Sequence, residues 1–236
     1  MSADIKTKDS ELIGAMFTAG AHFGYQKSRR NASVTPYIFG VKNKVEIIDL
    51  EQTLKMLDQA KSFVEGIAKL GKQILFVGGK NEARELVKLS AMSVDMPYVA
   101  GRWIGGTLTN APEIKKRIAK FEDLQKQKEK GELAKYTKKE RLLIDREIAN
   151  LDIMFSGIVS MRELPKALFV IDPRKEFIAV AEAKKMGVPV IAVLNTDCDI
   201  KDIDYPIIAN DASVSSIALF TAEIAKAYKA GKSAKV

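Results

Sequence analysis

The hydrophobic positions of the chain fall into short continuous runs that alternate with amphipathic stretches. Four runs are rich in Val, Ile, Leu and Phe and are bounded by turn residues, a pattern typical of strands buried on both faces of a sheet. They cover residues 73–79, 167–172, 188–195 and 205–210, and residues 96–101 form a fifth, shorter candidate. We expect all five segments to be strands of one sheet.

The stretches between these runs predict helices, because apolar residues recur there at steps of three and four. In residues 51–70, the side chains on one face are Leu54, Leu57, Val64, Ile67 and Leu70. Residues 82–92, 175–186 and 213–228 follow the same rule. Strands that alternate with helices in this way predict a parallel sheet covered by helices on both faces.

Residues 110–155 interrupt this alternation, since they contain no predicted strand. Two capping-box patterns, Asn110 with Glu113 and Thr137 with Glu140, predict that a helix begins at each place. Each helix has a narrow apolar seam. The first consists of Ile114, Ile118 and Phe121, and the second of Leu143, Ile148 and Leu151. Gly131 suits the turn between the two helices. We expect an inserted antiparallel helical hairpin, 110–155, that protrudes from an α/β body formed by residues 1–109 and 156–236.

Composition narrows the class of protein. Of the 236 residues 47% are hydrophobic, and there is no run of about 18 apolar residues that could span a membrane. The N-terminus lacks an apolar signal core and the single Cys198 cannot form an internal disulfide, so we expect a cytoplasmic protein. A lone His22 and a lone Cys198 argue against a structural zinc site, and no cofactor is expected. Residues 228–236 are small, polar and basic, and we expect them to fray.

The formal net charge of +8 is concentrated in two zones. Residues 21–44 carry five Lys or Arg and no acid, whereas residues 113–146 carry twelve Lys or Arg and seven acids. Concentrated positive charge suits an anionic polymer. The mixed-sign run is also typical of a solvated helical surface, and the acid-free run favours a binding role more strongly.

Enzyme motifs are weak by comparison. The Gly-Gly-Lys of residues 78–80 lies between a predicted strand and helix, where it could hold a nucleotide phosphate. Asn81 then replaces the Ser or Thr of a P-loop, so a tight turn is favoured. His22 has no nucleophile motif beside it, so no catalytic residue is expected. The turn with Asp197 and Asp199 could hold a metal, but a plain acidic turn is favoured because hard cations need several converging oxygens.

The acid-free basic run interleaves cations with aromatic rings. Bases can stack on aromatic side chains while Lys and Arg neutralise phosphates. We expect Phe23 and Phe39 to belong to the core, and Tyr25, Tyr37 and the cations of the run to be placed for contact with a nucleic acid.

Residues 101–110, with the sequence GRWIGGTLTN, hold the only tryptophan of the chain. We expect Arg102 to bind a backbone phosphate through its planar guanidinium. Gly105 and Gly106 would let the main chain turn and approach closely. Trp103 is either a packing residue or an RNA contact, and both interpretations stay open.

Several of these segments resemble the motifs of one family, the second small-subunit ribosomal protein of bacteria and organelles (the S-two family). The matching segments are AGAHFGYQ with PYIFGVKNKVEIIDLEQTL, then RWIGGTLTN, then PKALFVIDPRKEFIAVAEAKKMGVPVIAVLNTDCD. The resemblance implies a doubly wound parallel sheet, flavodoxin-like or Rossmann-like, with a protruding helical hairpin. It also implies a non-catalytic structural protein near the head–body junction of the small subunit. The implied partners are small-subunit ribosomal RNA, neighbouring proteins and, in many bacteria, ribosomal protein S-one.

The motifs and the charges together give one set of predicted RNA-binding residues. They are His22, Tyr25, Lys27, Arg29, Arg30, Asn31, Tyr37, Lys42, Lys44, Arg102, Trp103, Thr109, Asn110, Lys115 and Lys116. Many family members carry a second histidine where this chain has Tyr25, and many carry proline where it has Ile200, so no bound metal is expected. The alternative is a nucleotide-binding enzyme on a flavodoxin-like fold.

Overall fold

Five parallel strands form the central sheet of the computed structural model, which describes residues 2–161 and 163–234. Their order is β5-β4-β6-β7-β8. The strands are β4 (Ile74–Val77), β5 (Tyr98–Val99), β6 (Ala167–Ile171), β7 (Val190–Leu194) and β8 (Tyr205–Ile208). The five predicted strands are confirmed, and every residue of β4, β6 and β7 is buried, as the continuous apolar runs indicate. Because the strand order reverses between β4 and β6, the sheet is of the doubly wound, Rossmann-like kind.

Helices lie on both faces of this sheet. One face packs against α2 (Leu50–Lys69), α3 (Asn81–Met92) and α7 (Val214–Ser233), and the other packs against α6 (Phe177–Met186). Alternate strand residues serve the two faces, so that Phe76 joins the first core and Leu75 the second. The sequence prediction of a sheet covered on both sides is therefore confirmed.

The C-terminal helix α7 continues to Ser233, so the prediction that residues 228–236 fray is wrong for the described part of that segment. The Tyr228 hydroxyl donates a hydrogen bond of 2.9 Å to the main-chain oxygen of Lys72, and the Tyr228 ring is buried. Gly231 is buried where α7 lies against α2. Small residues near the end of the chain thus serve close helix packing.

Replacing Gly231 by alanine should destabilise the protein by about 1 to 3 kcal/mol. A Cβ atom there would lie 2.6 Å from the main-chain oxygen of Glu65 and 2.7 Å from the Cβ of Ala68, so α7 would have to move away from α2. Gly66 offers a matched control, because a Cβ atom at Gly66 meets nothing within 4 Å and alanine favours the helix. Urea unfolding should show a lower midpoint for Gly231→Ala and a higher one for Gly66→Ala. Equal midpoints would contradict the close packing of the two helices.

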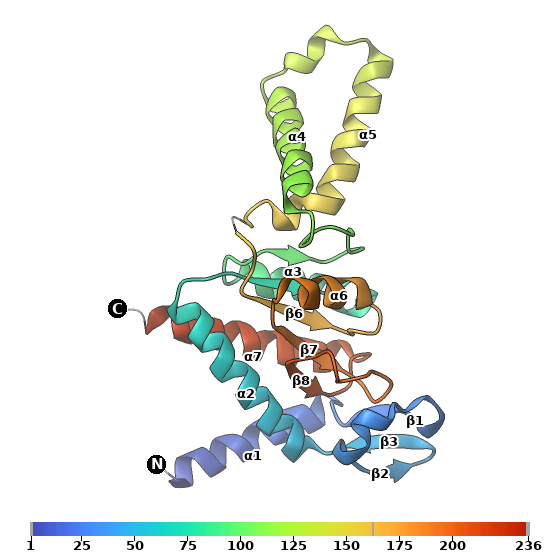
Figure 1. Cartoon of the computed structure of the whole chain (residues 1–236), viewed down its shortest axis with the longest axis vertical. Helices are drawn as coiled ribbons and strands as arrows, with labels where there is room; N and C mark the ends of the chain where they lie inside the picture. The colour runs from blue at the N-terminus through green and yellow to red at the C-terminus, as the bar shows by residue number, and fades with distance from the viewer. Residues whose placement is uncertain (1, 162, 235–236) are drawn as a thin grey trace.

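Two long helices, α4 (Ala111–Glu129) and α5 (Lys138–Phe155), extend away from the sheet at one end of the molecule (Figure 1). The capping box of Thr137 with Glu140 is confirmed. That of Asn110 with Glu113 is wrong, since the Asn110 side chain makes no capping hydrogen bond. The reason is local: Pro112 has no N–H to donate, and the N–H of Glu113 donates to the main-chain oxygen of Asn110 instead.

Within the described residues, the two long helices contact each other through a few apolar groups and two ion pairs. Lys120 pairs with Glu147, and Lys128 Nζ lies 2.7 Å from Asp145 Oδ1. Their buried residues are Ile114, Phe121, Ile148, Leu151 and Phe155. Leu143, expected on the seam, is exposed, whereas Ile144 packs against the core. Gly131 adopts a left-handed φ of 72° before the short helix η3 (Glu132–Lys135) that joins the pair.

A second, smaller sheet lies at the opposite end of the molecule from α4 and α5 (Figure 1). It consists of β1 (Phe23–Gln26), β2 (Ile38–Lys42) and β3 (Val45–Ile48), antiparallel in the order β1-β3-β2. The turns η1 (Lys27–Arg29) and η2 (Ala32–Tyr37) connect β1 to β2. Helix α1 (Ser2–Thr18) precedes the small sheet in the chain. Elsewhere, the short helix η4 (Ser156–Ile158) follows α5. The sequence prediction contained neither α1 nor this sheet.

Phe23 and Phe39 were expected in the core, and this prediction is wrong. Their exposed fractions are 47% and 81%. The small sheet has few buried side chains, because its short strands lie at the end of the molecule and its burial is concentrated at Glu46 and Ile48 of β3. Two aromatic rings therefore face solvent beside the basic run. Within the described residues, no helix has both the length and the apolar composition that a membrane span requires.

Candidate nucleic-acid interface

Three exposed lysines, Lys27, Lys42 and Lys44, surround the small sheet, and we call them the small-sheet lysines. Asn43 and Lys44 have positive φ angles of 52° and 66°, which is the geometry of a tight hairpin turn between β2 and β3. Among the residues that the structure describes, no acidic group pairs with any of the three. Their charge is therefore available to an external anion.

The two arginines of the same run differ from the lysines, because each has an acidic partner. Arg30 Nη1 lies 3.3 Å from Oε1 of Glu46, whose side chain is fully buried. Arg29 Nη2 lies 3.4 Å from Oδ2 of Asp197, and the Arg29 guanidinium also lies 4.3 Å from the centroid of the Tyr25 ring. Arg30 therefore neutralises a buried charge, while the more exposed Arg29 stacks on an aromatic face.

Tyr25, Asn31 and Tyr37 attach the basic run to the body, and the Tyr37 ring does so by packing against the core. The Tyr25 N–H donates to Thr196 Oγ1 (3.0 Å), and the Asn31 N–H donates to the Thr196 main-chain oxygen (2.8 Å). The Asn31 side chain accepts from the N–H of Ser33 and thereby caps η2. Thr196 follows β7, so the basic run is attached at the carboxyl-terminal edge of the central sheet. This is the edge where doubly wound folds bind ligands.

The ring of His22 faces the interior of the protein and not an external nucleic acid. It is buried and stacked on Phe17, with ring centroids 4.4 Å apart, and it also contacts Phe23. Burial lowers the pKa of His22, so the imidazole stays neutral at physiological pH. The predicted role of His22 as an RNA contact does not fit this position.

The Gly-Gly-Lys turn after β4 is occupied by internal charges. Lys80 Nζ lies 3.2 Å from both Asp172 Oδ2 and Asp211 Oδ2. Asp211 is almost fully buried and also accepts a hydrogen bond of 3.1 Å from Asn195 Nδ2. Burial, with the charge of Asp172, raises the pKa of Asp211 to about 6. Lys80 is thus a structural counter-ion and not a phosphate ligand, which agrees with the favoured interpretation of a tight turn.

The loop of residues 101–110 is organised by Glu182 of α6, which the sequence prediction did not single out. Its Oε1 accepts from Trp103 Nε1 (3.1 Å) and the N–H of Gly106 (2.7 Å). Its Oε2 accepts from the N–H of Leu108 (3.0 Å) and from the N–H and hydroxyl of Thr109 (both 3.1 Å). Gly106 adopts a φ of +92°, as a glycine allows. One carboxylate therefore gathers both ends of the loop.

Trp103 belongs to the core, because its exposed fraction is 5% and its indole N–H is satisfied by Glu182. The packing interpretation of Trp103 is therefore confirmed, and the buried ring has little free surface for an RNA contact. The Thr109 hydroxyl also donates its hydrogen bond to Glu182. Arg102 and Asn110 are exposed in the same loop.

Lys115 and Lys116 lie on the first turns of α4, and Lys116 Nζ is 3.4 Å from Glu113 Oε2. The predicted residues thus fall into two groups, one around the small sheet and one at the start of α4. The small sheet lies at one end of the molecule, whereas α4 begins where the two long helices leave the body (Figure 1).

The acidic turn after β7 is engaged by arginines. Asp197 Oδ2 lies 2.5 Å from Arg174 Nη1 and also pairs with Arg29. Burial raises the pKa of the Cys198 thiol to about 12, so it stays protonated and unreactive. Within the described ranges, no three His, Cys, Asp or Glu side chains converge as metal ligands would. The plain acidic turn is the interpretation that the geometry favours.

A model of the ribosomal protein S2 family matches residues 16–231, nearly the whole length. The chain belongs to the ribosomal protein S2 family. It is 45% identical over 212 residues to the small ribosomal subunit protein uS2 of Desulforapulum autotrophicum, which covers 90% of this chain and 76% of that protein. The uS2 proteins of Roseiflexus castenholzii and Coprothermobacter proteolyticus are each 44% identical over 92% of this chain, and 83% and 81% of theirs.

Membership of the ribosomal protein S2 family confirms the resemblance seen in the sequence motifs. The family consists of structural, non-enzymatic proteins of the small ribosomal subunit, so the chain is not an enzyme. The alternative of a nucleotide-using enzyme is wrong, and the internal pairing of Lys80 agrees with this result.

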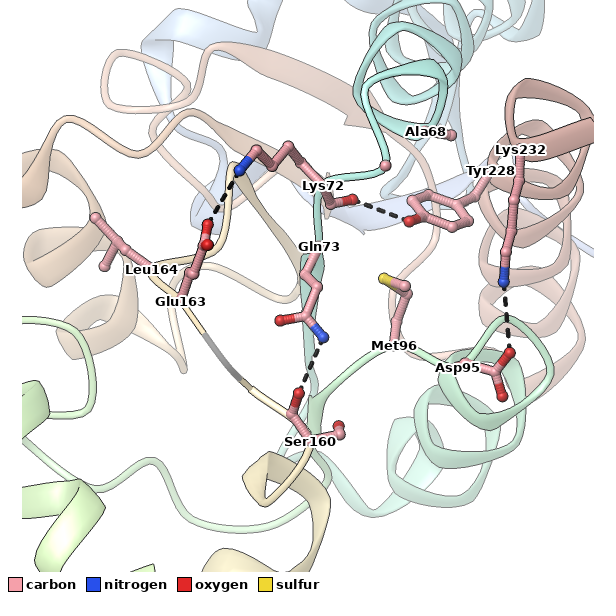
Figure 2. A pocket seen from close by; sticks show the side chains of 11 residues that line it. Ala68, Lys72, Gln73, Asp95, Met96, Ser160, Glu163, Leu164, Tyr228 and Lys232 are labelled. Atoms are coloured by element: carbon pink, nitrogen blue, oxygen red, sulfur yellow. Dashed lines mark hydrogen bonds and ion pairs between the residues drawn. The ribbon is translucent and has the colours of Figure 1, made fainter. Parts of the chain in front are cut away.

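A cavity of about 580 Å³ opens at the amino-terminal edge of the central sheet (Figure 2). Its charged side chains pair with one another: Lys72 Nζ lies 3.1 Å from Glu163 Oε2, and Lys232 Nζ lies 3.6 Å from Asp95 Oδ2. Tyr228 and Gln73 direct their polar groups to main-chain oxygens at its wall. Its charges are therefore balanced without a ligand.

Proposed function

We propose that the protein is a cytoplasmic structural constituent of the small ribosomal subunit that binds small-subunit ribosomal RNA near the head–body junction. The observation that carries this proposal is the set of small-sheet lysines, which are exposed and have no acidic partner among the described residues, in a member of a ribosomal protein family. Cations that no internal acid neutralises are the groups that a phosphate backbone recruits.

The roles of the predicted residues divide according to their surroundings. Lys27, Lys42, Lys44 and Arg102 are proposed to contact phosphates, because they are exposed and unpaired among the described residues. Arg29, stacked on Tyr25, is proposed to offer a flat cationic surface to a base or sugar. Arg30 and Asn31 serve the geometry of the site, since Arg30 neutralises Glu46 and Asn31 caps η2.

The test is sedimentation of a tagged copy through sucrose gradients. The protein should co-migrate with the small subunit at moderate salt and leave it at high salt, because phosphate contacts weaken as salt rises. Migration as a free small protein at both salt concentrations would contradict the proposal.

Replacing the small-sheet lysines by alanine should make the protein leave the subunit at a lower salt concentration. Loss of three phosphate contacts should reduce the slope of log affinity against log salt by about 2 to 3. The matched control replaces Lys69, Lys185 and Lys229, which are exposed and lie on helices α2, α6 and α7, and it should behave as the wild type. Equal behaviour of the two triple variants would show that the small sheet does not bind RNA.

We further propose that residues 110–155 form an inserted unit, separate from the body of residues 1–109 and 156–236, that docks a protein. Support comes from α5, where Leu142, Leu143, Ile153 and Met154 are exposed although they are apolar. Ribosomal protein S-one is the proposed partner. Deletion of residues 113–146 should remove S-one from the gradient fractions that contain the small subunit and this protein.

A further inference from the structure

A cavity of about 260 Å³ lies at the carboxyl-terminal edge of the central sheet. Its walls come from four places: Gly79 after β4, Arg84 of α3, residues 101–103 after β5, and residues 175, 176 and 178 at the start of α6. The strand order reverses between β4 and β6. Doubly wound sheets bind their ligands at such a reversal, so the cavity stands where the fold favours a ligand.

Three cations from three separate segments line this cavity: Arg84, Arg102 and Lys175. Arg84 Nε donates to the main-chain oxygen of Gly79 (3.1 Å), which fixes the guanidinium and leaves its terminal nitrogens unused. Within residues 2–161 and 163–234, the side chains of Arg102 and Lys175 make no hydrogen bond or ion pair. Neither of these two side chains is therefore held by an internal ion pair within the described residues.

One carboxylate, Glu176, also lines the cavity. It is buried, and its Oε1 accepts the N–H of Gly79 (3.0 Å). This bond ties the start of α6 to the turn after β4 and so fixes the cavity wall. A single negative charge against three positive ones leaves the cavity cationic.

The charge imbalance distinguishes this cavity from its neighbours. Lys80, on the same edge, is neutralised by Asp172 and Asp211. In the larger cavity of Figure 2, each lysine has a carboxylate partner. Three cations that share one carboxylate still repel each other, and a bound anion relieves that repulsion.

We propose that the cavity between Gly79, Arg102 and Lys175 binds one phosphate group, carried by a nucleotide or by an RNA chain. Guanidinium groups bind phosphate through parallel N–H donors. The volume of about 260 Å³ falls below the roughly 300–1,000 Å³ of small-molecule sites. The cavity thus holds a phosphate and part of a sugar, for which Trp103 and Ile178 provide an apolar wall.

The first test uses the purified full chain with inorganic phosphate as the probe. At a phosphate concentration ten times the Kd, binding to the folded state raises the folding constant about eleven-fold, which corresponds to a rise in Tm of roughly 3–6 °C. Sodium chloride at equal ionic strength should give a smaller shift. No shift beyond that of chloride overturns the proposal.

The decisive variant is Arg102→Ala with Lys175→Ala. Both side chains are exposed and unpaired among the described residues, so the variant should fold as the wild type. Its matched control, Lys185→Ala with Lys229→Ala, removes the same charge elsewhere on the surface. The phosphate shift should disappear in the first double variant and persist in the control. A shift that persists in both contradicts the site.

A second pair of measurements distinguishes a free nucleotide from an RNA chain as the source of the phosphate. Only this step rests on the proposed RNA-binding function. Adenosine monophosphate that stabilises the protein more than inorganic phosphate, with unchanged subunit association of a Lys175→Ala variant, identifies a free nucleotide. Weakened association of that variant with the subunit identifies an RNA phosphate. Failure of the phosphate shift leaves co-sedimentation of the wild type unaffected, so the two proposals fail separately.

Discussion

Replacing Glu182 by alanine should destabilise the protein by about 3 to 5 kcal/mol, one of the two largest losses that we expect from a single substitution. Glu182 is buried on α6 and accepts hydrogen bonds from Trp103, Gly106, Leu108 and Thr109. Alanine would leave the indole N–H and main-chain N–H groups without acceptors in a buried place. Each unsatisfied buried donor carries a desolvation penalty of about 1 to 3 kcal/mol.

Urea unfolding at neutral pH measures this loss, with Glu85→Ala as the control. Glu85 is an exposed helical glutamate on α3, and its replacement should change stability by less than about 0.5 kcal/mol. Glu182→Gln should lie between the two, because the amide keeps one acceptor oxygen but turns an NH2 group toward donors. A Glu182→Ala variant as stable as Glu85→Ala would show that the loop does not depend on the carboxylate.

The same residue predicts a pH dependence. Burial alone would raise the pKa of Glu182, but the hydrogen bonds from Gly106, Trp103, Leu108 and Thr109 outweigh it and hold the pKa below its usual value of 4.5. A carboxyl with a depressed folded pKa stabilises the fold above its unfolded pKa and loses that contribution as the pH falls through the folded value. The stability gap between wild type and Glu182→Gln should therefore narrow below pH 4.5.

The second large effect is expected for Lys80→Met, which should destabilise the protein by about 3 to 5 kcal/mol at pH 8. The substitution removes the cation that lies 3.2 Å from both Asp172 and Asp211. Two carboxylates would then face each other, one of them almost fully buried. An uncompensated buried charge is far less favourable than the intact pair.

The effect of Lys80→Met should be smaller at pH 5 than at pH 8. Burial and Asp172 already raise the pKa of Asp211 to about 6, and loss of Lys80 raises it further. An acid with a raised folded pKa stabilises the fold while it is protonated, and this contribution is lost as the pH rises through that pKa. Adding Asp211→Asn to Lys80→Met should recover more than half of the loss at pH 8. Equal destabilisation at both pH values, or no rescue, would mean that charge is not the cause.

The main sheet and its helices were predictable because each leaves a local periodic signal. The strands β4, β6 and β7 are buried on both faces and appear as unbroken apolar runs. The small sheet leaves no such signal, since its strands have four or five residues and mixed burial. Its exposed Phe23 and Phe39 resemble core residues in the sequence.

The sequence predicted which residues of the candidate site are exposed cations, but not which side chains have internal acidic partners. The lysines of the basic run were identified correctly as exposed, yet Arg30 turns inward to Glu46, which lies just beyond the acid-free segment. Glu182 is separated from its loop by more than 70 residues, and sequence periodicity carries no information about such a partner. Its position beside the buried Ala179 and Ala183 on α6 was the one available signal.

The carboxylate of Glu182 also fixes the base of a long helix. The loop that it gathers leads directly into α4, a helix of 19 residues and hence about 28 Å long. A tilt of about 10° at the base of such a helix moves its tip by about 5 Å. Small repacking around α6 is therefore magnified at the far end of α4.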